Sequence, residues 1–230
     1  MNSSWLEVIS KSTLFKGVAE EEIPRILDCL NSKVVDYKKN EYVALADEVF
    51  NGVGLVLNGE VAVIKENYSG SRTFLAVFKK GDLVGEIIAF YGENKWPATV
   101  LAQSDCTIMY IHPEKILDVC DKVCSSHKAL ISNMVRIISK KAFLLNRKVE
   151  YLTIKSMNGK LSKYLLEQYK KAGSSTFTIP LNREELADFL NVSRPSMSRE
   201  LCKMRDSGII DFYRESIRII NPVKLEEMLE

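Results

Sequence analysis

The sequence predicts an α+β protein in which an antiparallel β-roll is followed by a long helix and a small C-terminal domain of short helices and a hairpin. Three observations predict it. Between Lys33 and Ile111 apolar residues alternate with period two, and turn residues arrive about every eight to twelve positions. After Pro113 the apolar period becomes that of a helix. Between Leu181 and Pro222 two short helical stretches, joined by a short turn, precede two strand-like runs.

Length and composition are those of a globular protein with two domains. Of the 230 residues, 46% are hydrophobic and 27% charged, which excludes a disordered or collagen-like chain. The 32 Lys and Arg against 30 Asp and Glu give a net charge of +2, so affinity for nucleic acid requires locally placed charge. No apolar run reaches the roughly 18 residues that span a bilayer, and the start, MNSSWLEVIS, lacks the features of a signal peptide. We therefore expect a cytoplasmic protein with no membrane partner.

The first domain begins with residues 4–31, where apolar residues at three- and four-residue steps predict helix. The strands expected after it are VVDY, EYVAL, GVGLVL, EVAVI, RTFLAVF, PATVLA and CTIMYI. Asn58-Gly59, between GLVL and EVAVI, predicts a tight hairpin turn.

The long helix carries an apolar seam whose steps alternate between four and three residues, as in a coiled coil. The seam consists of Ile131, Val135, Ile138, Ala142, Leu145, Val149 and Leu152. A second stripe runs beside it through Leu130, Met134, Ile137 and Leu144. One face can pack on its own domain and the other on a partner, so we predict a homodimer through a parallel coiled coil. The alternative is that both stripes are buried within one chain.

A further helix is expected from Ile154 to Lys171 and an edge strand at TFTIP. The segment after it has the signals of two capped helices. Asn182 and Glu185 form a capping box for the first helix, and Asn191 suits the left-handed residue of the turn. Ser193 caps the second helix, and Pro195 fits its first turn. With the runs IIDFY and IRIIN behind it, this segment predicts a winged helix-turn-helix.

The second of these helices has an inner and an outer face. Met197, Leu201 and Met204 share the inner face, and the DNA contacts that we predict on the outer face are Arg194, Ser196, Arg199 and Lys203. The fork of an arginine can engage guanine O6 and N7 together, whereas Lys203 suits a phosphate. The alternative is a helical hairpin with a solvated basic face.

No residue pattern indicates catalysis or a metal site. The chain has no Ser/His/Asp arrangement, glycine-rich phosphate loop or CxxC motif, and its only histidines, His112 and His127, complete no zinc set. We therefore predict no enzyme activity and no metal. The cysteines are expected to act as small buried hydrophobes; they are Cys29, Cys106, Cys120, Cys124 and Cys202.

The order of these parts resembles the catabolite-activator and fumarate-nitrate-reduction regulator (Crp–Fnr) family of bacterial transcription factors. NVSRPSMSREL and GDLVGEIIAFYGENKWPATVLA carry the resemblance most specifically. It implies a cyclic-nucleotide-binding-like jelly roll, a homodimer, palindromic double-stranded DNA and RNA polymerase as a partner. Arg199 matches the base-reading arginine of the family, and Arg194 stands where some members have another. Pro195 replaces a glutamate that reads DNA in many members, so the usual target sequence is not carried over.

The resemblance also implies an effector site, at Gly85, Glu86, Trp96, Pro97, Leu145 and Asn146. In nucleotide-binding members Glu86 would accept from a ribose hydroxyl, but Trp96 and Pro97 stand where a phosphate-binding arginine and a hydroxyl residue are expected. Lys95 is the alternative cation, and Trp96 could stack on an aromatic ligand. We therefore expect an unidentified small molecule rather than cyclic AMP, and no iron–sulfur or haem cofactor.

These expectations define three regions: an effector-binding β-roll at 1–122, a dimerisation helix at 123–152 and a winged helix-turn-helix at 153–230. The function they predict is an effector-responsive, sequence-specific DNA-binding transcription regulator that acts as a homodimer on a palindromic operator. Two alternatives stay open. One is a small-molecule-binding module whose C-terminal domain mediates protein contacts, and the other is an enzyme.

Overall fold

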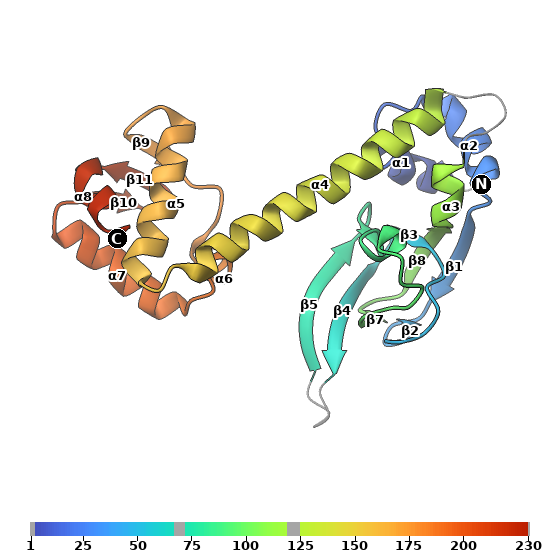
Figure 1. Cartoon of the computed structure of the whole chain (residues 1–230), viewed down its shortest axis with the longest axis horizontal. Coiled ribbons are helices and arrows are strands. Elements are labelled where there is room, and N and C mark those ends of the chain that lie inside the picture. Colours follow the sequence, from blue (N-terminus) through green and yellow to red (C-terminus); the bar gives the residue numbers. More distant parts are fainter. Residues whose placement is uncertain (1–2, 67–71, 119–124, 230) are drawn as a thin grey trace. The chain divides into compact units, whose positions relative to one another are not determined.

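The computed structural model describes residues 3–66, 72–118 and 125–229. It divides into two compact units, Met1–Lys141 and Ala142–Glu230. The long helix α4, Ser125–Thr153, contributes to both units (Figure 1). The expected boundary between residues 122 and 123 lies outside the described residues.

The N-terminal unit starts with short helices rather than with the continuous helix expected over residues 4–31. They are α1 (Ser3–Lys11), the 3-10 turn η1 (Glu20–Glu22) and α2 (Ile23–Cys29). Between them the chain folds back, with Leu14 and Phe15 fully buried and Gly17 at a positive φ of 82°. The three- and four-residue spacing arises from two helices whose apolar sides meet one core, so the expectation of helix was wrong for residues 12–19.

Two antiparallel four-stranded sheets form the roll, in the orders β1-β8-β3-β6 and β2-β7-β4-β5 (Figure 1). The strands are β1 (Lys33–Tyr37), β2 (Tyr42–Ala44), β3 (Val53–Asn58), β4 (Glu60–Glu66), β5 (Arg72–Lys79), β6 (Leu83–Val84), β7 (Thr99–Ala102) and β8 (Cys106–Ile111). Inward-facing residues of both sheets share one core with the short helices and the start of α4. A 3-10 turn, η2 (Ile88–Phe90), and a short helix, α3 (Pro113–Leu117), complete the connections.

The hairpin predicted at Asn58-Gly59 was wrong. Strand β3 pairs with β8 and β6, and β4 pairs with β5 and β7, so the turn carries the chain from one sheet to the other. Asn58 still pairs with Thr107 beyond an irregularity in the ladder, and Gly59 has a φ of 77°. A Cβ on Gly59 would lie 2.4 Å from the carbonyl oxygen of Asp105, so the position requires glycine for close packing as well as for its turn.

The start of α4 is fixed to the N-terminal unit by apolar and polar contacts. Leu130 and Met134 are buried in the core of that unit. The Nδ2 atom of the buried Asn133 donates to the carbonyl oxygens of Leu14, at 2.9 Å, and Lys16, at 2.7 Å. The loop between α1 and α2 therefore gains partners for its backbone from the helix.

The C-terminal unit contains α5 (Met157–Ala172), β9 (Thr176–Thr178), α6 (Arg183–Leu190), α7 (Arg194–Asp206), β10 (Ile210–Tyr213), β11 (Ser216–Ile219) and α8 (Pro222–Glu227). Its sheet has the order β10-β11-β9 (Figure 1). The last residues of α4 join this unit, where Tyr151 is fully buried and lies edge-on to Phe189 of α6 at 4.9 Å between ring centroids. The predicted fold class, a β-roll followed by a long helix and a winged helix-turn-helix, is confirmed.

Candidate nucleic-acid interface and ligand cavity

The helix-turn-helix forms as its capping residues predict. The Oδ1 atom of Asn182 accepts from the backbone N–H of Glu185 at 3.0 Å, while the Glu185 carboxylate accepts from the backbone N–H of Asn182 at 2.8 Å. Asn191 ends α6 in the left-handed region, with a φ of 53°, and the side chain of Ser193 caps α7. Because Leu186, Ala187 and Leu190 of α6 and Met197, Leu201 and Met204 of α7 are buried together, the two helices share one apolar face.

The opposite side of α7 is polar and exposed. Arg194, Arg199 and Lys203 are exposed there, and Ser196 is half-buried. The Oγ atom of Ser196 lies 2.8 Å from that of Ser193 and accepts from Nη2 of Arg199 at 3.4 Å. These four residues, Arg194, Ser196, Arg199 and Lys203, are called the reading face. The structure brings all of them to one helix, with the charged groups of the three basic residues free of the core.

The wing is tied to the start of α6 by an arginine that the sequence reasoning missed. Arg183 lies over the ring of Phe212, 4.7 Å from its centroid, and its Nη2 donates to the carbonyl oxygen of Arg214 at 3.2 Å. Burial lowers the pKa of the Arg183 guanidinium. Arg214, at the tip of the β10–β11 hairpin, has a φ of 54°. Only the pattern of an arginine in the first turn of α6 and an aromatic residue in the wing could have suggested this contact.

The N-terminal unit contains a largely apolar cavity of about 240 Å³. It is lined by Val63 of β4, Ala76 and Phe78 of β5, the segment Val84–Ile88, the segment Trp96–Ala98, Val100 of β7 and Lys141 of α4. Gly85, Glu86, Trp96 and Pro97, four of the expected effector residues, are therefore brought together at one cavity. Leu145 and Asn146 do not line it; they belong to the second unit, where both are exposed.

Glu86 and Lys141 form an ion pair at the wall of this cavity. The Glu86 side chain is only 2% exposed, and its Oε1 accepts from Nζ of Lys141. Among the described residues, Oε2 of Glu86 has no hydrogen-bond partner. The ammonium of Lys141 also lies 5.3 Å from the centroid of the Phe78 ring. Lys141 was missed from the sequence, although it lies one helical turn before Leu145 and a buried carboxylate requires a cation nearby.

The ring of Trp96 is packed into the cavity wall, so its whole face is not free to stack on a ligand. Trp96 is 3% exposed, and its ring lies 5.0 Å from that of Phe50. Gly85, with a φ of 84°, allows this approach, since a Cβ there would lie 2.7 Å from Phe50 and 2.9 Å from Trp96. Lys95, the alternative cation, is exposed and does not line the cavity.

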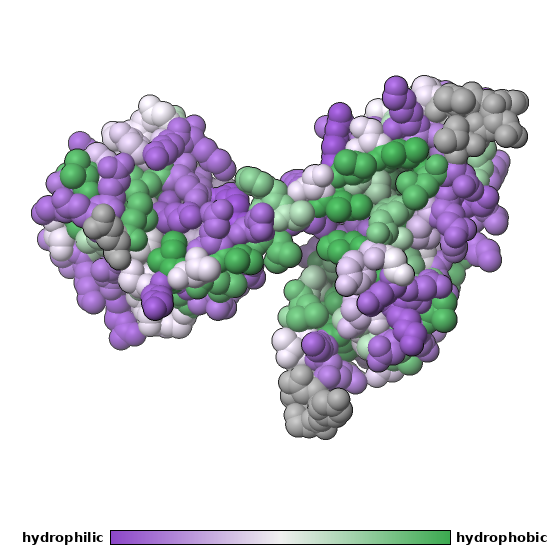
Figure 2. Space-filling model, viewed as in Figure 1, coloured by the Kyte–Doolittle hydropathy of each residue, from purple (hydrophilic) through white to green (hydrophobic). Residues whose placement is uncertain are grey.

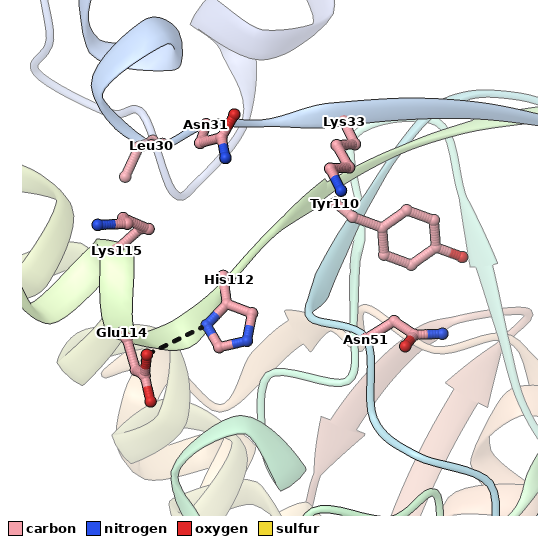
Figure 3. Close-up of a pocket in the computed structure, with 8 residues that line it drawn as sticks. All are labelled: Leu30, Asn31, Lys33, Asn51, Tyr110, His112, Glu114 and Lys115. Carbon is pink, nitrogen blue, oxygen red and sulfur yellow. Dashed lines mark ion pairs between the residues drawn. The ribbon is translucent and has the colours of Figure 1, made fainter.

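A second hollow, of about 310 Å³, lies beside the start of β1 and the end of β8 (Figure 3). Its lining is Leu30, Asn31, Lys33, Asn51, Tyr110, His112, Glu114 and Lys115. Nδ1 of His112 lies 3.8 Å from the Glu114 carboxylate, and the Tyr110 hydroxyl lies 3.0 Å from that of Tyr37. Most of these side chains are exposed, so the hollow is a polar surface feature rather than an enclosed site.

The apolar residues of α4 differ in how far they are buried. Of the second stripe, Leu130 and Met134 are buried and Ile137 is half-buried, but Leu144 is 49% exposed. In the predicted seam Ile131 and Ile138 are half-buried and Ala142 is exposed, while Val135, Leu145, Val149 and Leu152 are 46–65% exposed. Figure 2 shows hydrophobic surface along α4. The described chain therefore does not bury both stripes.

The expectation that the cysteines are buried holds for one of the described ones. Cys106 is buried, Cys202 is half-buried and Cys29 is exposed, so the expectation was wrong for Cys29 because it lies on the outer side of the short helix α2. Cys120 and Cys124 lie outside the described residues. Nowhere in the described ranges do three or more His, Cys, Asp or Glu gather as metal ligands, and no described helix has the length and apolar character needed to cross a membrane.

A β-roll with a largely apolar cavity, joined by a long helix to a winged helix-turn-helix, is the architecture of a class of DNA-binding regulators. Residues 34–123 match the cyclic nucleotide-binding domain, and residues 159–228 match the Crp-like helix-turn-helix domain. The chain belongs to the Crp–Fnr family and is a Crp-like transcription regulator with a DNA-binding helix-turn-helix domain.

Relatives of this chain are bacterial transcription regulators. A probable transcriptional regulator flp of Lacticaseibacillus casei is 26% identical over 75% of this chain and 77% of its own length. The cyclic AMP receptor protein of Thermus thermophilus is 20% identical over 94% of this chain and 96% of its own. The crystal structure of the Thermus thermophilus catabolite activator protein shares the fold, with a TM-score of 0.53 at 20% identity over 95% of this chain and 98% of its own.

Proposed function

We propose that this protein is an effector-responsive regulator that binds a palindromic operator sequence-specifically as a homodimer. In this proposal residues 1–122 bind the effector, 123–152 form the dimerisation helix, and 153–230 bind DNA and contact RNA polymerase. The observation that carries the proposal is the reading face of α7, held out by a helix-turn-helix whose other face is fully packed.

DNA recognition would rest on the reading face. The second helix of such a motif enters the major groove with its N-terminal residues at the base edges. Arg199 and Arg194 lie in the first half of α7, where a planar guanidinium can bind guanine O6 and N7. Lys203 lies one turn further along and suits a phosphate, which adds affinity and salt dependence.

Dimerisation would rest on the exposed part of the seam. Val135, Leu145, Val149 and Leu152 repeat at coiled-coil spacing and expose half of their surface or nearly so. Contiguous exposed apolar surface of this kind marks an interaction site. A second copy of α4 offers the matching surface, and a two-fold dimer would present two reading faces to half-sites about 34 Å apart.

Capture of genomic DNA by the purified full-length protein tests the proposal. We expect the retained fragments to share a two-fold symmetric motif with half-site centres about 10 base pairs apart, and sedimentation to give twice the chain mass. Failure to enrich any sequence, or a monomer bound to an asymmetric motif, would contradict the proposal. In the first case a C-terminal domain that mediates protein contacts would become the better interpretation.

A further inference from the structure

The charges at the cavity of the N-terminal unit balance. Of the described residues that line it, Glu86 and Lys141 are the charged ones, and they are paired with each other. A phosphate, carboxylate or ammonium group placed there would have to break this pair or remain unpaired in apolar surroundings. Both alternatives are costly, because an isolated charge loses its hydration without gaining a partner. The cavity therefore favours an uncharged molecule.

One polar atom of the cavity wall has no hydrogen-bond partner among the described residues. Oε1 of Glu86 is held by Lys141, but Oε2 has no partner among the described residues and is buried. A carboxylate oxygen can only accept, so the missing group is a donor. A buried acceptor without a donor costs free energy, and a ligand with a hydroxyl or N–H at this position removes that cost.

The rest of the wall is apolar and partly aromatic. Phe78 and Trp96 contribute ring surface, and aliphatic side chains from β4, β5 and β7 complete the wall. At about 240 Å³ the space lies just below the usual size of a drug-like ligand site. A small ring or short hydrocarbon body suits it better than a molecule with several polar groups.

We propose that this cavity binds a small, uncharged and mainly apolar molecule that donates one hydrogen bond to Oε2 of Glu86, and that it does not bind a cyclic nucleotide. The inference rests on the proposed function for its biological meaning, because the ligand would be the effector. Its chemistry rests on the Glu86–Lys141 pair and on the apolar lining alone.

The test uses two fluorinated probes of equal heavy-atom count, 4-fluorobenzyl alcohol and 1-ethyl-4-fluorobenzene, which differ by a hydroxyl in place of a methyl group. Binding to the full-length protein is followed by ¹⁹F NMR titration. We expect the alcohol to bind at least about tenfold more tightly, because it alone can satisfy the buried carboxylate oxygen. Since the ethyl compound is the more hydrophobic of the two, a cavity without this donor requirement would prefer it.

A matched pair of variants locates the effect. In Glu86→Ala the preference for the alcohol should disappear, whereas Glu60→Gln, which alters an exposed Lys–Glu pair of the same unit, should retain it. The comparison of the two probes on the unaltered protein decides the matter even if Glu86→Ala fails to fold. Cyclic AMP at millimolar concentration should not displace the alcohol.

Three results would overturn the inference: equal or weaker binding of the alcohol, its displacement by millimolar cyclic AMP, or binding of neither probe. These results are separate from the fate of the proposed function. Selective DNA capture without probe binding would support the proposed DNA-binding function and contradict the proposed ligand class. Probe binding without DNA capture would support the ligand class and contradict the DNA-binding function.

Discussion

Nη2 of Arg199 lies 3.4 Å from Oγ of Ser196, one turn earlier on the exposed side of α7. Ser196 in turn lies 2.8 Å from Oγ of the capping Ser193. The guanidinium therefore lies close to the helix N-terminus, where it contacts a hydroxyl group that itself lies beside the capping hydroxyl of Ser193. This arrangement limits the conformations that Arg199 must give up when it binds, which lowers the entropy cost of recognition.

Arg199→Ala should weaken binding to the operator by about 5- to 150-fold, because one bidentate base contact is worth about 1–3 kcal/mol. Binding to unrelated DNA should change far less, so selectivity falls with affinity. Gel-shift titration against operator and scrambled duplexes measures both. Unchanged selectivity in a correctly dimeric variant would exclude Arg199 from base reading.

Lys203→Ala provides the matched comparison on the same helix. Lys203 pairs with Glu200 at 3.3 Å and is otherwise exposed. If it contacts a phosphate, its loss should weaken specific and non-specific binding to the same degree. The slope of log affinity against log salt should then fall by about one unit. A change confined to the operator would mean that Lys203 reads a base.

Val149→Glu should dissociate the proposed homodimer, because it places a charge within the exposed part of the seam. Analytical ultracentrifugation would then show the chain mass at micromolar concentration, and circular dichroism should remain that of a folded protein. Lys140→Glu is the control, since Lys140 lies on the other side of α4 and is exposed. An unchanged dimer in Val149→Glu would show that the seam is not the interface.

The helix-turn-helix could be predicted residue by residue because its signals are local. The capping box at Asn182 and Glu185 and the left-handed Asn191 act within four residues of their own position, so sequence spacing alone specifies them. The inner faces of α6 and α7 follow from the helical period. No neighbouring element needs to be known for any of these predictions.

The roll was harder to predict because its turns depend on distant partners. Asn58-Gly59 has the composition of a hairpin, yet the backbone that lies against Gly59, at Asp105 and Cys106, belongs to the start of β8, a strand distant in sequence that pairs with β3. In the same way Lys141 reaches Glu86 across 55 positions of sequence. The strand content followed from period two, whereas sheet order and the ion pair required the tertiary structure.

Gly59→Ala should destabilise the N-terminal unit more than Gly92→Ala does. Both residues have positive φ, so each substitution costs about 1–2 kcal/mol of backbone strain. At Gly92 an added Cβ meets nothing within 4 Å, whereas at Gly59 it meets the backbone of Asp105. Urea unfolding of the two variants measures their free energies of unfolding. The backbone strain is common to both variants, so the difference between them gives the cost of the steric clash at position 59. Equal losses would indicate that the corner between the sheets opens without cost.

Cys106 should resist alkylation in the folded protein. Burial raises the pKa of its thiol to about 11, so at pH 8 only about one molecule in a thousand carries the reactive thiolate. The folded state holds this proton more tightly than the unfolded chain does, so the stability that Cys106 contributes below about pH 9 is lost as the pH rises toward 11. Peptide mass spectrometry after iodoacetamide treatment should show Cys29 modified before Cys106. Rapid labelling of Cys106 at pH 8 without denaturant would contradict this.

The close approach of Phe50 and Trp96 over Gly85 makes these three positions interdependent. An arginine in place of Trp96 would leave Phe50 without its ring neighbour, and a larger residue at position 85 would collide with both rings. A change of ligand preference through this part of the wall would thus need several coordinated substitutions. Single replacements would leave this part of the wall poorly packed.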